Sequence, residues 1–297
     1  MIAVLSGGTG TPKLLQGLVE VVDPEDITVI VNTAEDMWLP HGYFSPDIDT
    51  VMYTLSGQIN EEAWYGIKDD TFNTHKRLLE AGHREILNIG DRDRKTHIGR
   101  GELLKEGKSL PEAVDIQRRA FGIRAKILPM TDDEVQTVIV TPSGEMNLHE
   151  YLIEHRCRLE VDEIYFEGIE NARASREVTD AIKQADRVII GPSNPVSSIL
   201  PIISLGGIEI DSNKCIAISP IVGGKPVSGP ADRFMQARGY SPDSRGVAAI
   251  YKGLIHTLVV DNLENDFDIE GTQIIKTNTI MRSMADKRAL ARFILEI

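Results

Sequence analysis

Residues 1–18 read MIAVLSGGTGTPKLLQGL, and the order of apolar, glycine-rich and helical positions within them indicates the class of fold. Residues 2–5 predict a short buried strand, and residues 13–18 predict the start of a helix. The segment between them predicts a tight turn. Because such a turn directs free backbone N–H groups and the positive end of a helix at one point, it favours a bound phosphate or nucleotide. The predicted phosphate contacts in this turn are Gly7, Gly8, Thr9 and Gly10.

The glycine spacing separates this turn from two familiar nucleotide-binding motifs. A dinucleotide fingerprint requires G-x-G-x-x-G; Gly8 and Gly10 supply the first two glycines, but Lys13 stands at the third position. The P-loop pattern G-x-x-x-x-G-K-[ST] does not fit either. The spacing therefore argues against an NAD-type dehydrogenase. It leaves open a phosphate site, or an ordinary turn between strand and helix that uses glycine only for its backbone angles.

A second apolar run, at residues 27–31, follows a helical stretch at residues 12–22. A strand, a helix and a strand in this order form a βαβ unit with parallel pairing and a right-handed crossover. The alternation returns later, with predicted strands at 187–191, 215–218, 256–260 and near 274, and a last helix from about 283. We therefore predict an α/β, Rossmann-like fold over residues 1–297 as a single domain, with a mainly parallel sheet and helices on both faces.

Residues from about 61 to 125 depart from this alternation. Residues 72–79 have helical spacing, and Ser109 with Glu112 forms a capping box that predicts the start of another helix. We interpret the region as a mostly helical, lid-like insertion over the sheet. Beyond it, residues 135–148 predict a β-hairpin.

The chain has 297 residues, of which 41% are hydrophobic and 26% charged, and its net charge is −13 at pH 7. This acidity argues against a nucleic-acid partner, which would favour a basic surface. An acidic protein can still bind phosphate esters through Mg²⁺ held by carboxylates. No run approaches the roughly 20 apolar residues of a membrane span. Two cysteines are too few for a disulfide framework, so we expect a cytoplasmic protein without a membrane partner.

Polar and glycine-rich segments follow the predicted strands at their carboxyl ends, where open α/β sheets bind their ligands. Asn32 follows the second strand. Residues 86–89, a further predicted strand, lead into the run GDRD, and the loop GPSNP at residues 191–195 follows a later strand. These positions predict phosphate contacts from Asn32, Ser193 and Asn194. Helix capping by Ser193 and Asn194 is the alternative interpretation.

The run Pro46-Asp47-Ile48-Asp49-Thr50 carries two carboxylates. In an extended segment Asp47 and Asp49 project to the same side. Neighbouring carboxylates repel each other, and a divalent cation between them removes that cost. We therefore predict a Mg²⁺ site at Asp47 and Asp49; a turn or a helix cap is the alternative, because aspartate is common in both.

Several longer motifs occur in a fixed order along nearly the whole chain: LSGGTGTPKLLQGL, NTAEDMW, SPDIDT, NIGDRD, LPMTDD, GPSNPVSSILPII, SPIVGGKPVSGPADRFM and TNTIM. Together they resemble the 2-phospho-L-lactate transferase family, called CofD. The resemblance implies an enzyme of coenzyme F-420 biosynthesis that transfers 2-phospholactate from lactyl-2-diphospho-5′-guanosine to the terminal ribityl hydroxyl of the deazaflavin Fo. GMP leaves, Mg²⁺ is required, and the expected fold is a Rossmann-like core with a helical addition, often in a homodimer.

Carried onto this chain, the resemblance implies that Asp49 is catalytic, contacts Fo and binds the metal, and that Asn88 is a second Fo contact. Many relatives have a basic residue before the IGDRD-like run, where this chain has Asn88. The Gly7–Gly10 turn, Ser193 and Asn194 would line the guanylyl phosphates. Which three-carbon acid the donor carries stays open.

A second class of function is compatible with part of these motifs. A related group shares the glycine-rich opening and the GPSNP-like loop but is regulatory and non-catalytic, and binds sugar nucleotides. The feature that favours the transferase is SPDIDT together with the helical insertion, because both are needed to hold a flat tricyclic acceptor.

Overall fold

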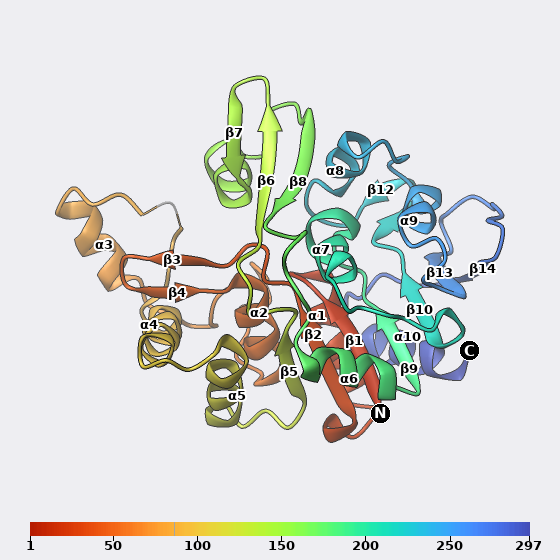
Figure 1. Cartoon of the computed structure of the whole chain (residues 1–297), viewed down its shortest axis with the longest axis horizontal. Helices are drawn as coiled ribbons and strands as arrows, with labels where there is room; N and C mark the ends of the chain where they lie inside the picture. Colours follow the sequence, from red (N-terminus) through yellow and green to blue (C-terminus); the bar gives the residue numbers. More distant parts are fainter. Residues whose placement is uncertain (86) are drawn as a thin grey trace.

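A computed structural model describes residues 1–85 and 87–297. Within these residues, a parallel sheet of seven strands in the order β14-β13-β10-β9-β1-β2-β5 forms the centre of the molecule (Figure 1). The strands are β1 (Ile2–Ser6), β2 (Ile27–Val31), β5 (Lys126–Pro129), β9 (Arg187–Ile190), β10 (Cys215–Ile218), β13 (Thr257–Asp261) and β14 (Gln273–Thr277). Every pairing in this sheet is parallel. The predicted α/β, Rossmann-like fold is confirmed.

The order of the strands reverses beside β1. Successive strands β1, β2 and β5 extend the sheet in one direction, and β9, β10, β13 and β14 extend it in the other. In open α/β sheets the loops at such a switch point separate, and a ligand crevice forms at the carboxyl ends of the strands. The segments that follow β1 and β9 are the glycine-rich turn and the GPSNP loop.

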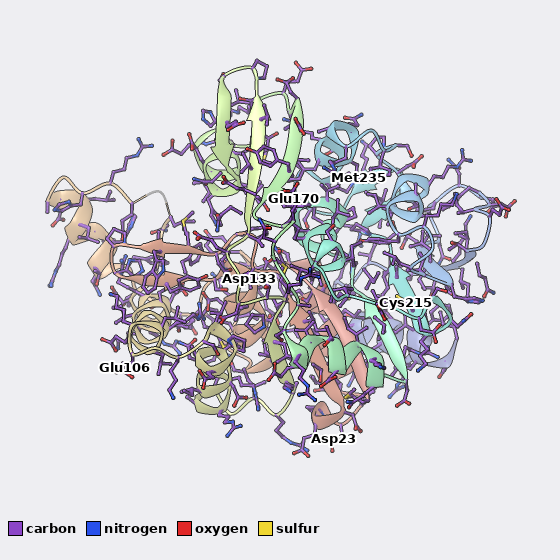
Figure 2. The ribbon with its side chains drawn as sticks, viewed as in Figure 1. Asp23, Glu106, Asp133, Glu170, Cys215 and Met235 are labelled. Carbon is purple, nitrogen blue, oxygen red and sulfur yellow. The ribbon has the colours of Figure 1, made fainter. Side chains whose placement is uncertain are left out.

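Helices cover both faces of the sheet, as predicted, because neighbouring residues of each buried strand point to opposite faces. Ile2 and Val4 of β1 belong to one apolar core, and Ala3 and Leu5 belong to the other. The first core includes α1 (Gly10–Leu18), α2 (Pro46–Leu55), α5 (Leu110–Ala120) and α10 (Met284–Glu296). The second includes α6 (Arg176–Gln184), α7 (Leu200–Ser204), α8 (Ala231–Ala237) and α9 (Ser244–Ile250). Figure 2 shows their side chains around the sheet, with Cys215 of β10 labelled inside it.

The region predicted as a helical insertion contains α3 (Asn73–Glu80), α4 (Asp91–Lys105) and α5, and the capping box of Ser109 and Glu112 is formed. In Figure 1, α3 and α4 lie at one end of the molecule beside the hairpin of β3 (Met37–Leu39) and β4 (Gly42–Phe44). Close packing joins the two elements, since a Cβ at Gly42 would lie 2.3 Å from the carbonyl oxygen of His97 in α4.

The strand predicted at residues 86–89 is wrong for residues 87–89, and Ile86 lies outside the described residues. Residues 87–89 form no strand hydrogen bonds and lead directly into the start of α4. The carboxylate of Asp70 accepts the backbone N–H groups of Arg92 and Asp93 at the beginning of α4. The sheet position beside β2 is taken by β5, a strand that was not predicted from the sequence.

The predicted hairpin is present as β6 (Gln136–Thr141) and β7 (Gly144–Asn147), and β8 (Glu163–Glu167) adds an unpredicted third strand to it. This small antiparallel sheet projects from the body of the molecule (Figure 1). The remaining short elements are η1 (Pro24–Asp26), η2 (Glu150–Glu154), η3 (Pro195–Ile199), η4 (Ser212–Lys214), β11 (Ile221–Val222) and β12 (Lys225–Pro226). In the described part of the chain, no helix has the length and apolar character needed to cross a bilayer.

Gly10 gives a first testable prediction. A Cβ at this position would lie 1.8 Å from the carbonyl oxygen of Pro192, so the turns after β1 and β9 approach each other too closely for any side chain. We expect Gly10→Ala to lower the free energy of unfolding by about 3 kcal/mol in urea titrations.

Gly99 in α4 supplies the matched control for that substitution, because a Cβ there would meet nothing nearer than 3.9 Å. Gly99→Ala is expected to stabilise the protein by about 0.5–1 kcal/mol, since alanine favours a helix interior. Equal stability of Gly10→Ala and the wild type would contradict the close approach of the two turns.

Candidate functional site

The described residues enclose a cavity of about 700 Å³ at the switch point of the sheet. Its walls come from the glycine-rich turn, the GPSNP loop, the start of α2 and the beginning of the insertion. The lining residues that the sequence had pointed to are Gly8, Thr9, Gly10, Asp47, Asp49, Asn88, Ser193 and Asn194. The glycine-rich corner and the Asp49 segment therefore face the same cavity, as the predicted site requires.

Ser193 links the GPSNP loop to the glycine-rich turn through hydrogen bonds. Its Oγ accepts the backbone N–H of Gly7 at 3.2 Å and lies 2.7 Å from the hydroxyl of Thr11. Asn194 caps η3, because its Oδ1 accepts the backbone N–H groups of Val196 and Ser197. The capping interpretation thus holds for Asn194, although both Ser193 and Asn194 still line the cavity.

The extended geometry predicted for Asp47 and Asp49 is wrong, because both residues lie in the first turn of α2. Pro46 at the start of a helix and carboxylates in its first turn both stabilise helix formation. Residues two apart in a helix are separated by about 200° around its axis, so the two side chains point in different directions. Each carboxylate has its own set of partners.

Asp47 points to the glycine-rich turn. Its Oδ2 accepts the side-chain amide of Asn32 at 3.0 Å, and the backbone N–H of Gly8 also donates to it. Burial raises the pKa of Asp47 to about 6, against the opposing effect of these hydrogen bonds. Asn32 is fully buried, and its side-chain Oδ1 accepts the backbone N–H of Ala34. In this structure Asn32 therefore positions Asp47 and does not line the cavity.

Glu35 is a site residue that was not predicted from the sequence. It lines the cavity, and burial together with the nearby charge of Asp47 raises its pKa well above the usual range. None of the ion pairs among the described residues involves Glu35 or Asp47. Two carboxyl groups in one cavity without a basic partner are suited to a divalent cation.

Asp49 points to α4, where Arg100 holds it. The two guanidinium nitrogens of Arg100 contact its two carboxylate oxygens, and Arg100 is fully buried. His97 Nε2 lies 3.3 Å from Asp49 Oδ2. Burial alone would raise the pKa of Asp49, but Arg100 and His97 outweigh it and hold the pKa at about 2. Asp49 is therefore a fixed negative charge at the wall of the cavity.

Asp93 completes this cluster. Its Oδ1 accepts the hydroxyl of Tyr53 at 2.7 Å and lies 3.1 Å from His97 Nε2. Burial lowers the pKa of His97, but Asp49 and Asp93 outweigh it and raise that pKa to about 9. Asp49, Asp93 and His97 have the spacing of a metal site. However, Arg100 already supplies the positive charge that a metal would bring, so this group does not fit a metal ion.

The sequence contained a signal for this cluster. Asp93, His97 and Arg100 follow one another at spacings of four and three residues in the run DRDRKTHIGR, which places them on one face of a helix. Polar residues on one face of a helix that packs inward indicate a buried network.

A Rossmann-like α/β protein with a glycine-rich turn and buried carboxylates around one cavity at the switch point belongs to the class of proteins that bind phosphorylated or nucleotide ligands. Comparison with known families is more specific. The model of the family described as 2-phospho-L-lactate transferase CofD matches residues 2–289, so the chain belongs to this family. It is accordingly a transferase.

Individual proteins agree with this assignment. The chain is 50% identical to the 2-phospho-L-lactate transferase of Methanothermobacter thermautotrophicus, over 99% of this chain and 97% of that protein. It is 46% identical to the 2-phospho-L-lactate transferase of Methanocaldococcus jannaschii, over 100% of this chain and 97% of that protein. Among solved structures, a member of the UPF0052 family from Bacillus halodurans has a similar fold, with a TM-score of 0.64, 16% identity and coverage of 99% of this chain and 98% of that one.

Proposed function

We propose that this protein transfers the 2-phospholactyl group of lactyl-2-diphospho-5′-guanosine to the terminal ribityl hydroxyl of the deazaflavin Fo, in the biosynthesis of coenzyme F-420. Its relatives at 50% and 46% identity are 2-phospho-L-lactate transferases. The observation that carries the proposal is the single cavity that joins the glycine-rich turn, Asp47 and Asp49. We further propose a cytoplasmic homodimer.

The reaction is a displacement at phosphorus. The ribityl hydroxyl oxygen of Fo attacks the phosphorus that carries the lactyl group, and a new O–P bond forms. The bond from that phosphorus to the bridging oxygen breaks, its electron pair leaves on the oxygen of GMP, and the hydroxyl proton passes to solvent. In such transfers the protein acts mainly by positioning the reactants and neutralising charge.

The residues around the glycine-rich turn fit a Mg²⁺ ion. Glu35 and Asp47 are the carboxylates that would hold it, since both face the cavity, burial raises the pKa of each, and the charge of Asp47 raises that of Glu35 further. Mg²⁺ bound there would neutralise the phosphates of the donor. Asn32 and the N–H of Gly8 orient Asp47 for this role. The metal contact predicted for Asp49 is the less favoured part of this proposal, because Arg100 occupies both of its carboxylate oxygens.

We propose that Asp49 acts on Fo as an oriented acceptor of hydrogen bonds. A general base works best when its pKa is near the working pH, whereas the pKa of Asp49 is held at about 2. A permanent carboxylate can instead accept the ribityl hydroxyl and fix its direction toward phosphorus. Asn88, which lines the same cavity, is the second proposed Fo contact.

An assay of purified protein tests the proposed function. With Fo, the guanylyl donor and Mg²⁺, we expect two products in equal amounts, GMP and the phospholactyl ester of Fo. Chromatography with detection of Fo fluorescence measures their formation. Removal of Mg²⁺ with EDTA is expected to stop the reaction, and Asp47→Asn is expected to raise the Mg²⁺ concentration for half-maximal rate by about tenfold or more.

Glu106→Gln is the control, because Glu106 is exposed at the end of α4 (Figure 2) and does not line the cavity. It is expected to leave the Mg²⁺ dependence unchanged. Binding of GDP and Fo without formation of product would contradict the transferase proposal and favour a regulatory protein that binds sugar nucleotides.

A further inference from the structure

Lys13 occupies the place where the third glycine of a dinucleotide fingerprint would stand, and it lines the cavity. It lies in the first turn of α1, directly after the glycine-rich turn. Lys13 thus lies within one helical turn of the free N–H groups at the start of α1, in the wall of the same cavity.

The Lys13 ammonium rests on an aromatic ring. Its Nζ lies 4.6 Å from the centroid of the Trp64 ring, and Trp64 also lines the cavity. Such an arrangement stabilises a cation by about 0.5–2 kcal/mol. The ring thus supports the charge of Lys13 and limits the positions that its flexible side chain can take.

Trp64 has a backbone conformation that is rare for a large side chain. Its φ of 57° is in the left-handed region, which is costly for a bulky residue and is found where surrounding contacts enforce it. Its backbone N–H donates to the carbonyl of Asn60 at 2.8 Å, and the bridge between Ile59 and Ile67 closes the loop. The insertion therefore presents Trp64 to the cavity in a defined orientation.

A second lysine contacts the same ring but has different partners. Lys287 Nζ lies 5.0 Å from the centroid of Trp64, donates to Gln16 and lies 3.9 Å from the carboxylate of Glu61. Lys13 has no carboxylate within 4.0 Å in the described part of the chain. Burial and the charge of Lys287 lower the pKa of Lys13, and the attraction of Glu61 only partly opposes them. An anionic ligand would compensate this cation.

The cavity carries charges of both signs. Glu35 and Asp47 are among its carboxylates, and Lys13 and Arg282 are the lysine and arginine side chains among the described lining residues. A diphosphate that contacts both a metal held by carboxylates and a lysine ammonium has its negative charge balanced.

We propose that Lys13 is a binding residue for the diphosphate of the guanylyl donor, and that Trp64 is a positioning residue that orients the Lys13 ammonium. The assignment deepens the proposed function and rests on it for the identity of the donor. In the transfer, the O–P bond to the bridging oxygen breaks and negative charge develops on the departing GMP. Lys13 stays protonated throughout and stabilises that charge without giving up a proton.

The chain has two tryptophans, so Trp38→Phe leaves Trp64 as the only indole reporter. In this variant we expect GDP with Mg²⁺ to change the Trp64 fluorescence in a saturable way, because phosphate draws the ammonium from the ring. Guanosine, which lacks phosphate, is expected to give no change. GDP that binds by calorimetry without altering Trp64 fluorescence would overturn the proposal, and this readout needs no substitution of Lys13.

Calorimetry measures the contribution of Lys13 directly. Lys13→Ala is expected to weaken GDP binding by about 10- to 100-fold, the size of a charge-assisted contact, and Lys13→Arg to restore most of it. Lys105→Ala is the matched control, because the Lys105 ammonium also lies over a tryptophan, 5.4 Å from the centroid of Trp38, but Lys105 does not line the cavity. It is expected to bind GDP like the wild type.

The role of Trp64 is tested by a double-mutant cycle. Trp64→Leu is expected to weaken GDP binding severalfold when Lys13 is present and to have no further effect in Lys13→Ala. Equal effects in both backgrounds would overturn the positioning role. If the wild type binds GDP and Lys13→Ala binds it within twofold, the Lys13 assignment is wrong while the proposed function stands; if the wild type binds no GDP, both are wrong.

Discussion

Asp49→Asn is expected to lower kcat by about 10²- to 10³-fold, the loss seen when one oriented polar group of an active site is removed. Asparagine keeps the size of the side chain but removes the charge that Arg100 and His97 hold in place. The measurement is the initial rate of ester formation at saturating Fo and donor. Full activity of the variant would remove Asp49 from the mechanism.

The same experiment separates a metal-ligand role of Asp49 from a contact with Fo. Recovery of the rate at raised Mg²⁺ would support a metal-ligand role, whereas a rate that Mg²⁺ does not restore supports the contact with Fo. Because the pKa of Asp49 is held at about 2, the carboxylate stays ionised above about pH 4. Loss of wild-type activity between pH 5 and pH 7 would therefore not arise from Asp49.

The lowered pKa of Asp49 also makes the stability of the folded protein depend on pH. The pKa of Asp49 falls from 3.8 to about 2 on folding, so its ionised form stabilises the folded state above pH 3.8. That contribution is lost as the pH falls from about 3.8 toward 2.

Arg100→Met is expected to lower the free energy of unfolding by about 3–5 kcal/mol, because it leaves Asp49 charged and buried without a partner. Arg100 also donates to Gln117 of α5 at 3.0 Å and contacts the carbonyl of Tyr43. It therefore ties the insertion to α2 and to the β3–β4 hairpin. The measurement is chemical denaturation in urea.

Two further variants distinguish this explanation from a general loss of packing. Asp49→Asn combined with Arg100→Met is expected to recover part of the lost stability, because the double variant removes both charges and leaves neither buried alone. Arg119→Met removes an exposed ion pair with Asp115 and is expected to cost at most about 1 kcal/mol. A similar cost for Arg100→Met and Arg119→Met would show that the buried pair does not stabilise the fold.

Regular patterns in the chain were sufficient to predict the layers of the fold. The alternating core of β1 and the runs that became β2, β9, β10 and β13 are local in sequence, and so is the capping box at Ser109. The missed strand β5 and the wrong strand at residues 87–89 have one physical cause. A short apolar run becomes a strand only if a neighbouring strand offers it hydrogen bonds, and that neighbour is chosen by the tertiary fold.

The sequence by itself determined the α/β class, the family and the set of segments that meet at the carboxyl edge of the sheet, because local periodicity and motif order carry that information. Only the tertiary structure decided which groups pair within the site. In the folded protein Asp49 pairs with Arg100, and Asp47 accepts hydrogen bonds from Asn32 and Gly8. The Lys13 ammonium lies over the Trp64 ring. The physical reason is that a buried charge takes its state from neighbours distant in sequence, and these are brought to it only when the insertion packs against the sheet.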